Sequence, residues 1–219
     1  MENKKLLLIV GSTGKGKSSS IRNMPMDRTA YIDFDRKAIK AFKGMEKLNQ
    51  WIKVDYVDHL EPGLKALEED DSIDFIVIDT MSFALDMFVS QKIEGSVDSR
   101  AMWGEYKQWF NRIMHIAKTS KKSYVFIMHD KSAYNEEAME VKTQAYAQGS
   151  IFGAVESHFA VVAYAHKYLD ENNMPKYGFL VGPTKDTLHL SAKSPMMMFD
   201  EPLIKDNDVM LLFEAIDNY

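Results

Sequence analysis

The sequence contains no cysteine, and this absence excludes several kinds of chemistry at once. Disulfide bridges, thiolate zinc sites and cysteine nucleophiles all need a side chain that the protein lacks. No segment reaches the roughly 18 consecutive apolar residues that span a membrane, so we expect no membrane partner. The apolar run at residues 6–10 ends in a glycine-rich segment and is too short for the core of a signal peptide. Together these absences favour a cytoplasmic protein.

Positive charge is also limited. The chain has 27 lysines and arginines against 32 aspartates and glutamates, which gives a net charge of −5. A protein that holds a nucleic acid along many phosphates is usually basic over its binding face. We therefore expect any contact with nucleic acid to be local, weak or shared among subunits.

The length and the pattern of apolar residues indicate the fold class. The 219 residues are enough for one sizeable α/β domain, and no repeat or linker divides them, so we expect a single domain over residues 1–219. Strand-like and helical segments alternate, which predicts a mostly parallel central sheet flanked by helices. The expected strands are residues 4–10, 29–35, 51–57, 72–80 and 123–129. The expected helices are residues 17–23, 36–48, 60–70, 81–93 and 100–120.

The pattern changes in the last third of the chain. Residues 131–149 are polar and lack a clear period, which predicts a mobile loop. Residues 157–169 and 176–182 are typical of two strands around a turn, so we expect an antiparallel extension of the sheet. A C-terminal helix is predicted over residues 207–219.

A phosphate-binding motif follows the first expected strand. Gly11 to Ser18 match G-x-x-x-x-G-K-[ST] at every fixed position, between a strand and an expected helix. The glycines allow backbone N–H groups to turn toward phosphate oxygens, and the helix start adds its dipole. We expect Lys17 to reach the β- and γ-phosphates of ATP. The expected nucleotide-binding residues are Gly11, Ser12, Thr13, Gly14, Lys15, Gly16, Lys17, Ser18 and Ser19. The alternative interpretation is a flexible surface turn.

A second motif supplies a carboxylate for Mg²⁺. Asp79 ends the apolar strand "DFIVIDT", and a carboxylate at that point holds the metal directly or through water. The Ser18 hydroxyl is the other expected ligand. Asp79 could instead cap the following helix, a role that Thr80 can also fill.

Hydrolysis also needs a group that orients water. Asp33 and Asp35 end the second strand, where a carboxylate can polarise a water molecule opposite Lys17. We interpret Asp35 as the water-activating acid and Asp33 as the second candidate; the alternative is a pair of solvated loop acids. His129 ends the strand "YVFIMH" and is a candidate sensor of the γ-phosphate, although a lone histidine is often structural.

These elements occur in an order that resembles the RecA-like ATPases. "YIDFD" is similar to the RecA strand that ends on a catalytic glutamate, and the resemblance assigns that role to Asp35, whose side chain is one methylene shorter. Over nearly its whole length the chain looks like the small phage nucleotide-binding proteins of the AAA type that accompany single-strand annealing and recombination. The segments that carry this likeness are "GSTGKGKS", "VIDT", "MWGEYKQWF", "FIMHDK", "QGSIFGAVESHFAVVAYA", "SAKSPMMMF" and "IDNY".

The resemblance implies an activity and partners. It implies slow, DNA-stimulated ATP hydrolysis in a ring or filament of identical subunits, with the nucleotide at a subunit junction. Single-stranded DNA and a phage annealing or single-strand-binding protein are the implied partners, and the host cytoplasm is the implied location. Lys193 in "HLSAKSP" is the implied basic finger from the neighbouring subunit, with Lys185 second; each could equally be a solvated lysine.

The same resemblance also implies a role for the polar segment after His129. It implies that this segment faces DNA, where lysines follow the backbone and tyrosines stack on bases. Its candidates are Lys131, Tyr134, Lys142 and Tyr146, opposed by Glu136, Glu137 and Glu140.

Two other functions and one structural interpretation remain open. One is a small-molecule kinase, which uses the same phosphate loop but usually carries an arginine-bearing lid over the phosphates. In residues 94–112, where such a lid would be expected, the only arginines are Arg100 and Arg112. A nucleotide-gated assembly module with little turnover is the other alternative, because Asp35 replaces the usual glutamate. The aromatic residues Trp103, Tyr106, Trp109 and Phe110 are interpreted mainly as core, with part of the stripe available to a neighbouring subunit.

Overall fold

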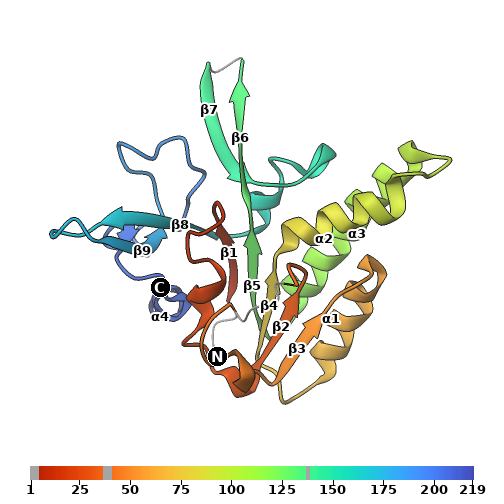
Figure 1. Cartoon of the computed structure of the whole chain (residues 1–219), viewed down its shortest axis with the longest axis horizontal. Coiled ribbons are helices and arrows are strands. Elements are labelled where there is room, and N and C mark those ends of the chain that lie inside the picture. The colour runs from red at the N-terminus through yellow and green to blue at the C-terminus, as the bar shows by residue number, and fades with distance from the viewer. Residues whose placement is uncertain (1–4, 37–40, 137–138) are drawn as a thin grey trace.

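The computed structural model describes residues 5–36, 41–136 and 139–219 (Figure 1). Eight strands form the central sheet, in the order β10-β9-β8-β1-β5-β4-β2-β3. Their bounds are β1 Leu6–Val10, β2 Thr29–Asp33, β3 Gln50–Lys53, β4 Phe75–Asp79, β5 Ser123–Met128, β8 Val161–Leu169, β9 Pro175–Leu180 and β10 Leu203–Ile204.

The sheet is parallel from β3 to β8 and antiparallel at its β9–β10 edge. The predicted mixed sheet is therefore confirmed, with one refinement: β8 itself runs parallel to β1, and antiparallel pairing begins at β9. Central strands such as β1 and β4 are near-continuous apolar runs because helices cover both of their faces.

Helices cover both faces of the sheet (Figure 1). Helices α1 (Leu60–Glu69), α2 (Met81–Phe88) and α3 (Ser99–Thr119) pack on one face, and α4 (Val209–Asn218) packs on the other. A π-helical turn, Val89–Ile93, continues α2. Short 3₁₀ helices occupy Ser18–Ile21, Met26–Arg28, Met45–Lys47, Val57–His59, Gly149–Ile151 and Val155–His158.

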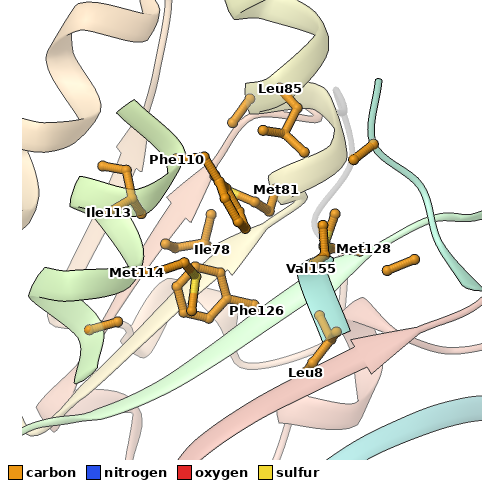
Figure 2. Packing of buried hydrophobic residues seen from close by; sticks show 14 of the residues in the cluster. Leu8, Ile78, Met81, Leu85, Phe110, Ile113, Met114, Phe126, Met128 and Val155 are labelled. Carbon is orange, nitrogen blue, oxygen red and sulfur yellow. The ribbon is translucent and has the colours of Figure 1, made fainter. Parts of the chain in front are cut away.

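Alternating side chains of the strands feed two apolar clusters. Leu8, Ile78 and Phe126 point to the α1–α3 face, where they meet Met81 of α2 and Phe110 of α3 (Figure 2). The intervening residues of the same strands point to the opposite face and pack against α4. This two-sided burial is what a parallel sheet between helices requires.

The aromatic stripe of α3 lies mainly in the core. Tyr106, Trp109 and Phe110 are buried, and Trp103 is half-buried against the ring of Tyr106. The Phe88 ring of α2 packs against both Tyr106 and Trp109. The interpretation of this stripe as core is therefore confirmed.

The predicted mobile loop over residues 131–149 is wrong. The segment contains a β-hairpin, β6 (Asp130–Asn135) paired with β7 (Glu140–Ala145), which projects from the body of the sheet (Figure 1). The sequence of this segment shows no clear apolar period, because most of the described side chains of the hairpin are exposed. Within β7, only Thr143 and Ala145 are buried. Backbone pairing with the 189–191 segment, through Thr143, anchors the base of the hairpin.

The predicted helix over residues 36–48 also differs from the structure. Residues 37–40, including Ile39, lie outside the described residues. The remainder forms turns and the short 3₁₀ helix Met45–Lys47, which starts after Gly44 in a left-handed conformation. Phe42 and Met45, two of the three side chains on the expected apolar side, are nevertheless buried in the cluster beneath α4. Burial does not need a regular helix here because turns place the same side chains inward.

Across the described ranges, no helix combines the length and the apolar character needed to cross a membrane.

Candidate functional site

The carboxyl ends of four adjacent parallel strands form the candidate site. Strand β5 lies between β1, which leads into the phosphate loop, and β4, which ends on Asp79. In register, Val10 lies beside Met128, and Asp79 lies beside both Ile127 and Asp33. Ligand-binding residues of open α/β sheets gather at this edge, so the sequence motifs converge where chemistry is expected.

The phosphate loop, Gly11–Ser18, follows β1 directly. Gly14 and Gly16 have φ values of 78° and 85°, a left-handed conformation that L side chains rarely adopt. A Cβ on Gly16 would also lie 2.5 Å from the side-chain nitrogen of Asn207. Glycine at position 16 is therefore required both by the backbone conformation and by the space around it.

Lys17 lies within the curve of this loop. Its side chain is 6% exposed, and Nζ donates hydrogen bonds to the carbonyl oxygens of Gly11, at 2.6 Å, and Ser12, at 2.9 Å. The ammonium group is thus held over the start of the loop, where a terminal phosphate oxygen would compete for the same protons.

The helix predicted over residues 17–23 is only a 3₁₀ turn, Ser18–Ile21. Two serines of this turn donate side-chain hydrogen bonds to backbone carbonyls: Ser19 Oγ to Gly16 O and Ser20 Oγ to Lys17 O. Such bonds compete with the backbone hydrogen bonds of a regular helix. A turn this short supplies little helix dipole. The loop's own backbone N–H groups and Lys17 must therefore supply most of the attraction for phosphate.

The two predicted metal ligands converge on a third residue, Tyr31 of β2. Its hydroxyl donates a hydrogen bond to Asp79 Oδ2 and is also hydrogen-bonded to the Ser18 side chain. Tyr31 is 2% exposed and Asp79 is 1% exposed. Burial, followed by the nearby Asp79 charge, raises the pKa of Tyr31 well above its usual value, so this hydroxyl keeps its proton.

This arrangement fits Mg²⁺. A serine hydroxyl and a carboxylate are hard oxygen ligands, and they are brought together beside a loop suited to phosphates. Thr80 caps α2, because its Oγ1 accepts from Phe83 N, so Asp79 is not needed as the cap. The alternative interpretation of Asp79 as a helix cap is therefore wrong. Sequence analysis missed Tyr31, since only the register of β2 against β4 brings its hydroxyl to Asp79.

Asp33 and Asp35 differ in their surroundings. Asp33 is 4% exposed, and its two oxygens accept hydrogen bonds from Trp51 Nε1, at 3.1 Å, and from Arg36 N, at 2.7 Å. These bonds fix the turn that follows β2. Asp35 lies within that turn and is half-buried. Asp33 therefore serves to shape the segment that carries Asp35.

His129 follows β5 and is half-buried. Its ring packs edge-on against Phe83 of α2, with centroids 5.3 Å apart, and its backbone N donates to Ser82 Oγ. The next residue makes the direct contact with the phosphate loop: Asp130 Oδ2 accepts from Ser12 Oγ at 3.0 Å. Sequence analysis missed Asp130, because its contact with Ser12 joins segments that are 118 positions apart in the sequence.

Lys193 lies away from the phosphate loop of its own chain. Its backbone pairs with Val162 of β8, level with Leu8 in the middle of β1, and its side chain is exposed. Lys185 is also exposed, on the segment that follows β9. Thr184 and Asp186, which flank Lys185, line the same cavity as Ser12 and Lys15, whereas Lys193 is not among the residues that line it.

The segment before α4 holds the phosphate loop through hydrogen bonds. Asn207 Nδ2 donates to Gly16 O at 3.0 Å, and Arg22 Nη1 donates to Asn207 O at 2.9 Å. Arg22 also pairs with Asp206, and Asn23 Nδ2 donates to Asp208 Oδ2. Residues 206–208 thus hold both the loop and the turn after it. No sequence motif marks this segment.

One cavity is lined in part by the phosphate loop, and a second lies behind Asn207. One, of about 540 Å³, is lined by Ser12 and Lys15 together with Asp130 and His166. The other, of about 900 Å³, lies between the β8–β9 hairpin and the segment that ends at Asn207.

Comparison with known proteins agrees with this geometry. The family model described as an AAA domain matches residues 3–195. No curated protein matches the sequence significantly. Among solved structures, the KaiC-like protein PH0186 from the hyperthermophilic archaeon Pyrococcus horikoshii OT3 matches with a TM-score of 0.50 and 13% identity. The match covers 84% of this chain and 81% of that one. The predicted RecA-like P-loop fold is thereby confirmed.

Proposed function

The chain belongs to the AAA domain family, and from this premise we propose that it binds and hydrolyses ATP and acts on single-stranded DNA in phage recombination or annealing. The observation that carries the nucleotide part is the convergence of Lys17, Ser18 and Asp79 around the phosphate loop and Tyr31. The DNA and phage parts rest on the resemblance of the sequence and on the hairpin described below.

The residues of the site divide the work of hydrolysis. Lys17 exchanges its carbonyl partners for phosphate oxygens and stabilises the charge that develops there. Ser18 and Asp79 hold Mg²⁺, which when bound neutralises phosphate charge. Asp35 accepts a proton from the attacking water, while Asp33 keeps the Asp35 turn in place. His129 senses whether the terminal phosphate is present.

The β6–β7 hairpin is the proposed contact with single-stranded DNA. It follows β5 directly and projects from the sheet (Figure 1). Lys131, Tyr134 and Lys142 are exposed on it, which suits a backbone track with a stacking ring. Glu136 and Glu140 are exposed near its end and oppose phosphate, so we expect binding to be weak and salt-sensitive.

The proposed function includes assembly of identical subunits into a ring or filament. Lys193 is exposed and lies away from its own phosphate loop, so its proposed role is as a finger in the site of the neighbouring subunit of a ring or filament. The nucleotide then lies at the subunit junction, and binding at one site affects contacts between copies. A phage annealing or single-strand-binding protein is the proposed partner.

The test measures ATP turnover with and without single-stranded DNA. We expect DNA to raise the rate of the wild-type protein, and Lys17→Ala to abolish turnover both ways. Replacing Lys131 and Lys142 together by alanine should leave the basal rate intact and remove the stimulation. The control replaces two exposed lysines remote from the hairpin, Lys107 and Lys121, and should retain the stimulation. Turnover that is indifferent to DNA in the wild type contradicts the DNA part of the proposal.

A second candidate function is a nucleotide-gated assembly module with little turnover. The observation that favours it is that Asp35 carries a shorter side chain than the catalytic glutamate it replaces in the resemblance. This function predicts ATP-dependent assembly in sedimentation experiments with no release of inorganic phosphate.

A further inference from the structure

A second polar and aromatic cavity lies beside the phosphate loop, on the side opposite the metal ligands. It has a volume of about 900 Å³ and lies between the β8–β9 hairpin and residues 203–207. Tyr168 and Tyr177 of the hairpin and Asn207 are among its lining residues. Small-molecule sites have volumes of roughly 300–1,000 Å³, so its size suits a nucleoside.

The wall of the cavity packs against the phosphate loop at Gly16. Asn207 donates its side-chain hydrogen bond to Gly16 O, and Tyr177 Cδ1 lies 3.4 Å from the point that a Cβ on Gly16 would occupy. A side chain at position 16 would clash with Asn207 and crowd Tyr177. Because Gly16 has none, these two lining residues of the cavity can lie directly against the loop.

The direction of a bound triphosphate follows from the order of the strands. Asp79 and Tyr31 lie on β4 and β2, on one side of β1, whereas β8 and β9 lie on the other side (Figure 1). The terminal phosphate belongs at the Lys17 and metal-ligand end. The nucleoside must then leave the loop toward β8 and β9, where this cavity lies.

We propose that this cavity holds the base and ribose of the nucleoside triphosphate, with the Tyr177 ring packed against the base. The inference rests on the proposed nucleotide binding and adds the site of the nucleoside. Tyr177 is 39% exposed, and Lys167 Nζ lies 5.8 Å from its ring centroid, so the ring is accessible and oriented by its neighbour. Every base has a face that can stack on such a ring.

The walls of the cavity are built before any ligand arrives. Tyr168 OH donates to Lys205 O at 2.6 Å, and Arg22 holds both Asp206 and Asn207. Gly178 allows close approach of β10, because a Cβ there would lie 2.2 Å from Ile204 O. A pre-formed wall binds a ligand without the cost of ordering it first.

The test compares ATP with inorganic triphosphate, which lacks a nucleoside. We measure the affinity of each, with Mg²⁺, for the wild type, Tyr177→Ala, Tyr177→Phe and Lys17→Ala. Tyr177→Ala should weaken ATP binding about tenfold and leave triphosphate binding unchanged, because only the stacking surface is lost. Tyr177→Phe, which keeps the ring, should retain ATP affinity. Tyr219→Ala, which removes an exposed tyrosine outside the cavity, is the matched control.

The outcomes separate this inference from the proposed function. Equal loss of ATP and triphosphate affinity in Tyr177→Ala, or no loss of either, overturns the nucleoside site even if Lys17→Ala abolishes binding. Failure of the wild type to bind ATP overturns the proposed function itself. Photo-cross-linking with 8-azido-ATP provides a second measurement. Adducts on residues 168–177 or 203–207 support the site, and adducts confined to other segments contradict it.

Discussion

Asn207, which immediately precedes the cap of α4, donates a hydrogen bond to the carbonyl oxygen of Gly16 in the phosphate loop, although 191 residues separate them. The donor nitrogen and the acceptor oxygen are 3.0 Å apart, and Asn207 is buried. A carbonyl that accepts this bond cannot rotate freely, so the N–H groups that follow it keep a fixed direction. The segment before the last helix therefore helps to fix the conformation of the phosphate loop.

Replacing Asn207 by alanine should weaken ATP binding about fivefold, because one hydrogen bond that orients the loop is worth about 1 kcal/mol. Isothermal calorimetry with Mg²⁺ measures the change. Asn207→Asp tests the same contact in a different way, since it keeps the shape but loses the donor, and it should weaken binding at least as much. The control is Asn111→Ala on the exposed surface of α3, which should bind ATP as the wild type does. Equal affinity in all three variants would contradict a positioning role for Asn207.

Tyr31→Phe should raise the Mg²⁺ concentration needed for ATP binding, because Ser18 and Asp79 lose the hydroxyl that links them. Stability should fall by roughly 2 kcal/mol, the typical contribution of a hydrogen bond to a charged group. The readouts are ATP affinity as a function of Mg²⁺ and urea unfolding.

Tyr124→Phe is the matched control for this prediction. Tyr124 is equally buried and donates to Glu68, but it lies near the start of β5, remote from the phosphate loop. It should lose comparable stability while its Mg²⁺ dependence stays that of the wild type. An unchanged Mg²⁺ requirement in Tyr31→Phe would show that the hydroxyl only stabilises the fold.

Only part of the candidate site could be predicted from the sequence. Gly11–Ser18 and Asp79 are recognisable because a phosphate loop and a strand-end acid are local patterns. Tyr31, Asp130 and Asn207 are not, since each reaches the site only through strand register or through contacts between distant segments. The residues of a motif lie close together in the sequence and can be recognised there. The residues that hold them in place come from distant segments and are identified only from the tertiary structure.

The same distinction applies to the fold. The mostly parallel pairing of the sheet follows from strands that alternate with helices, and it was predicted correctly. The β6–β7 hairpin was missed because its described side chains are mostly exposed, and its pairing depends on backbone bonds that hydrophobic period does not report. The turns at residues 41–48 were mistaken for a helix because Phe42 and Met45 are buried at a helical spacing without one.

Glu156 gives the protein a pH dependence with a definite sign. It lies at the base of the hairpin, where its Oε1 accepts from Ala145 N and from Tyr164 OH. Burial raises the pKa of this carboxyl above its ordinary value of 4.5, outweighing those bonds. The folded state therefore holds a proton that the unfolded state has released, and the free energy of unfolding falls as pH rises from 4.5 through the folded pKa.

Glu156→Gln removes this effect, because the amide keeps an acceptor oxygen and carries no charge. Relative to the wild type, the variant should gain stability as pH rises from 4 to 8, measured by urea unfolding. Glu61→Gln is the opposite control, since hydrogen bonds from Lys65 and Arg112 lower the pKa of Glu61. That variant should lose relative stability as pH rises from 3 through 4.5. Parallel slopes in the two variants would contradict the assignment for Glu156.

Asp33, which ends β2, and Asp35, two residues later, should show different defects when each is replaced by its amide. Asp35→Asn should bind ATP with wild-type affinity but lower turnover by about a hundredfold or more, because a general base typically contributes 10²–10⁴-fold. Asp33→Asn should instead lower stability, since Asp33 accepts from Trp51 Nε1 and Arg36 N in a buried position, and an amide can accept at one oxygen only. ATP titrations, single-turnover hydrolysis and urea unfolding distinguish the two patterns. If Asp33→Asn folds with wild-type stability and has lost hydrolysis, while Asp35→Asn retains it, then Asp33 activates the water and the Asp35 assignment is wrong.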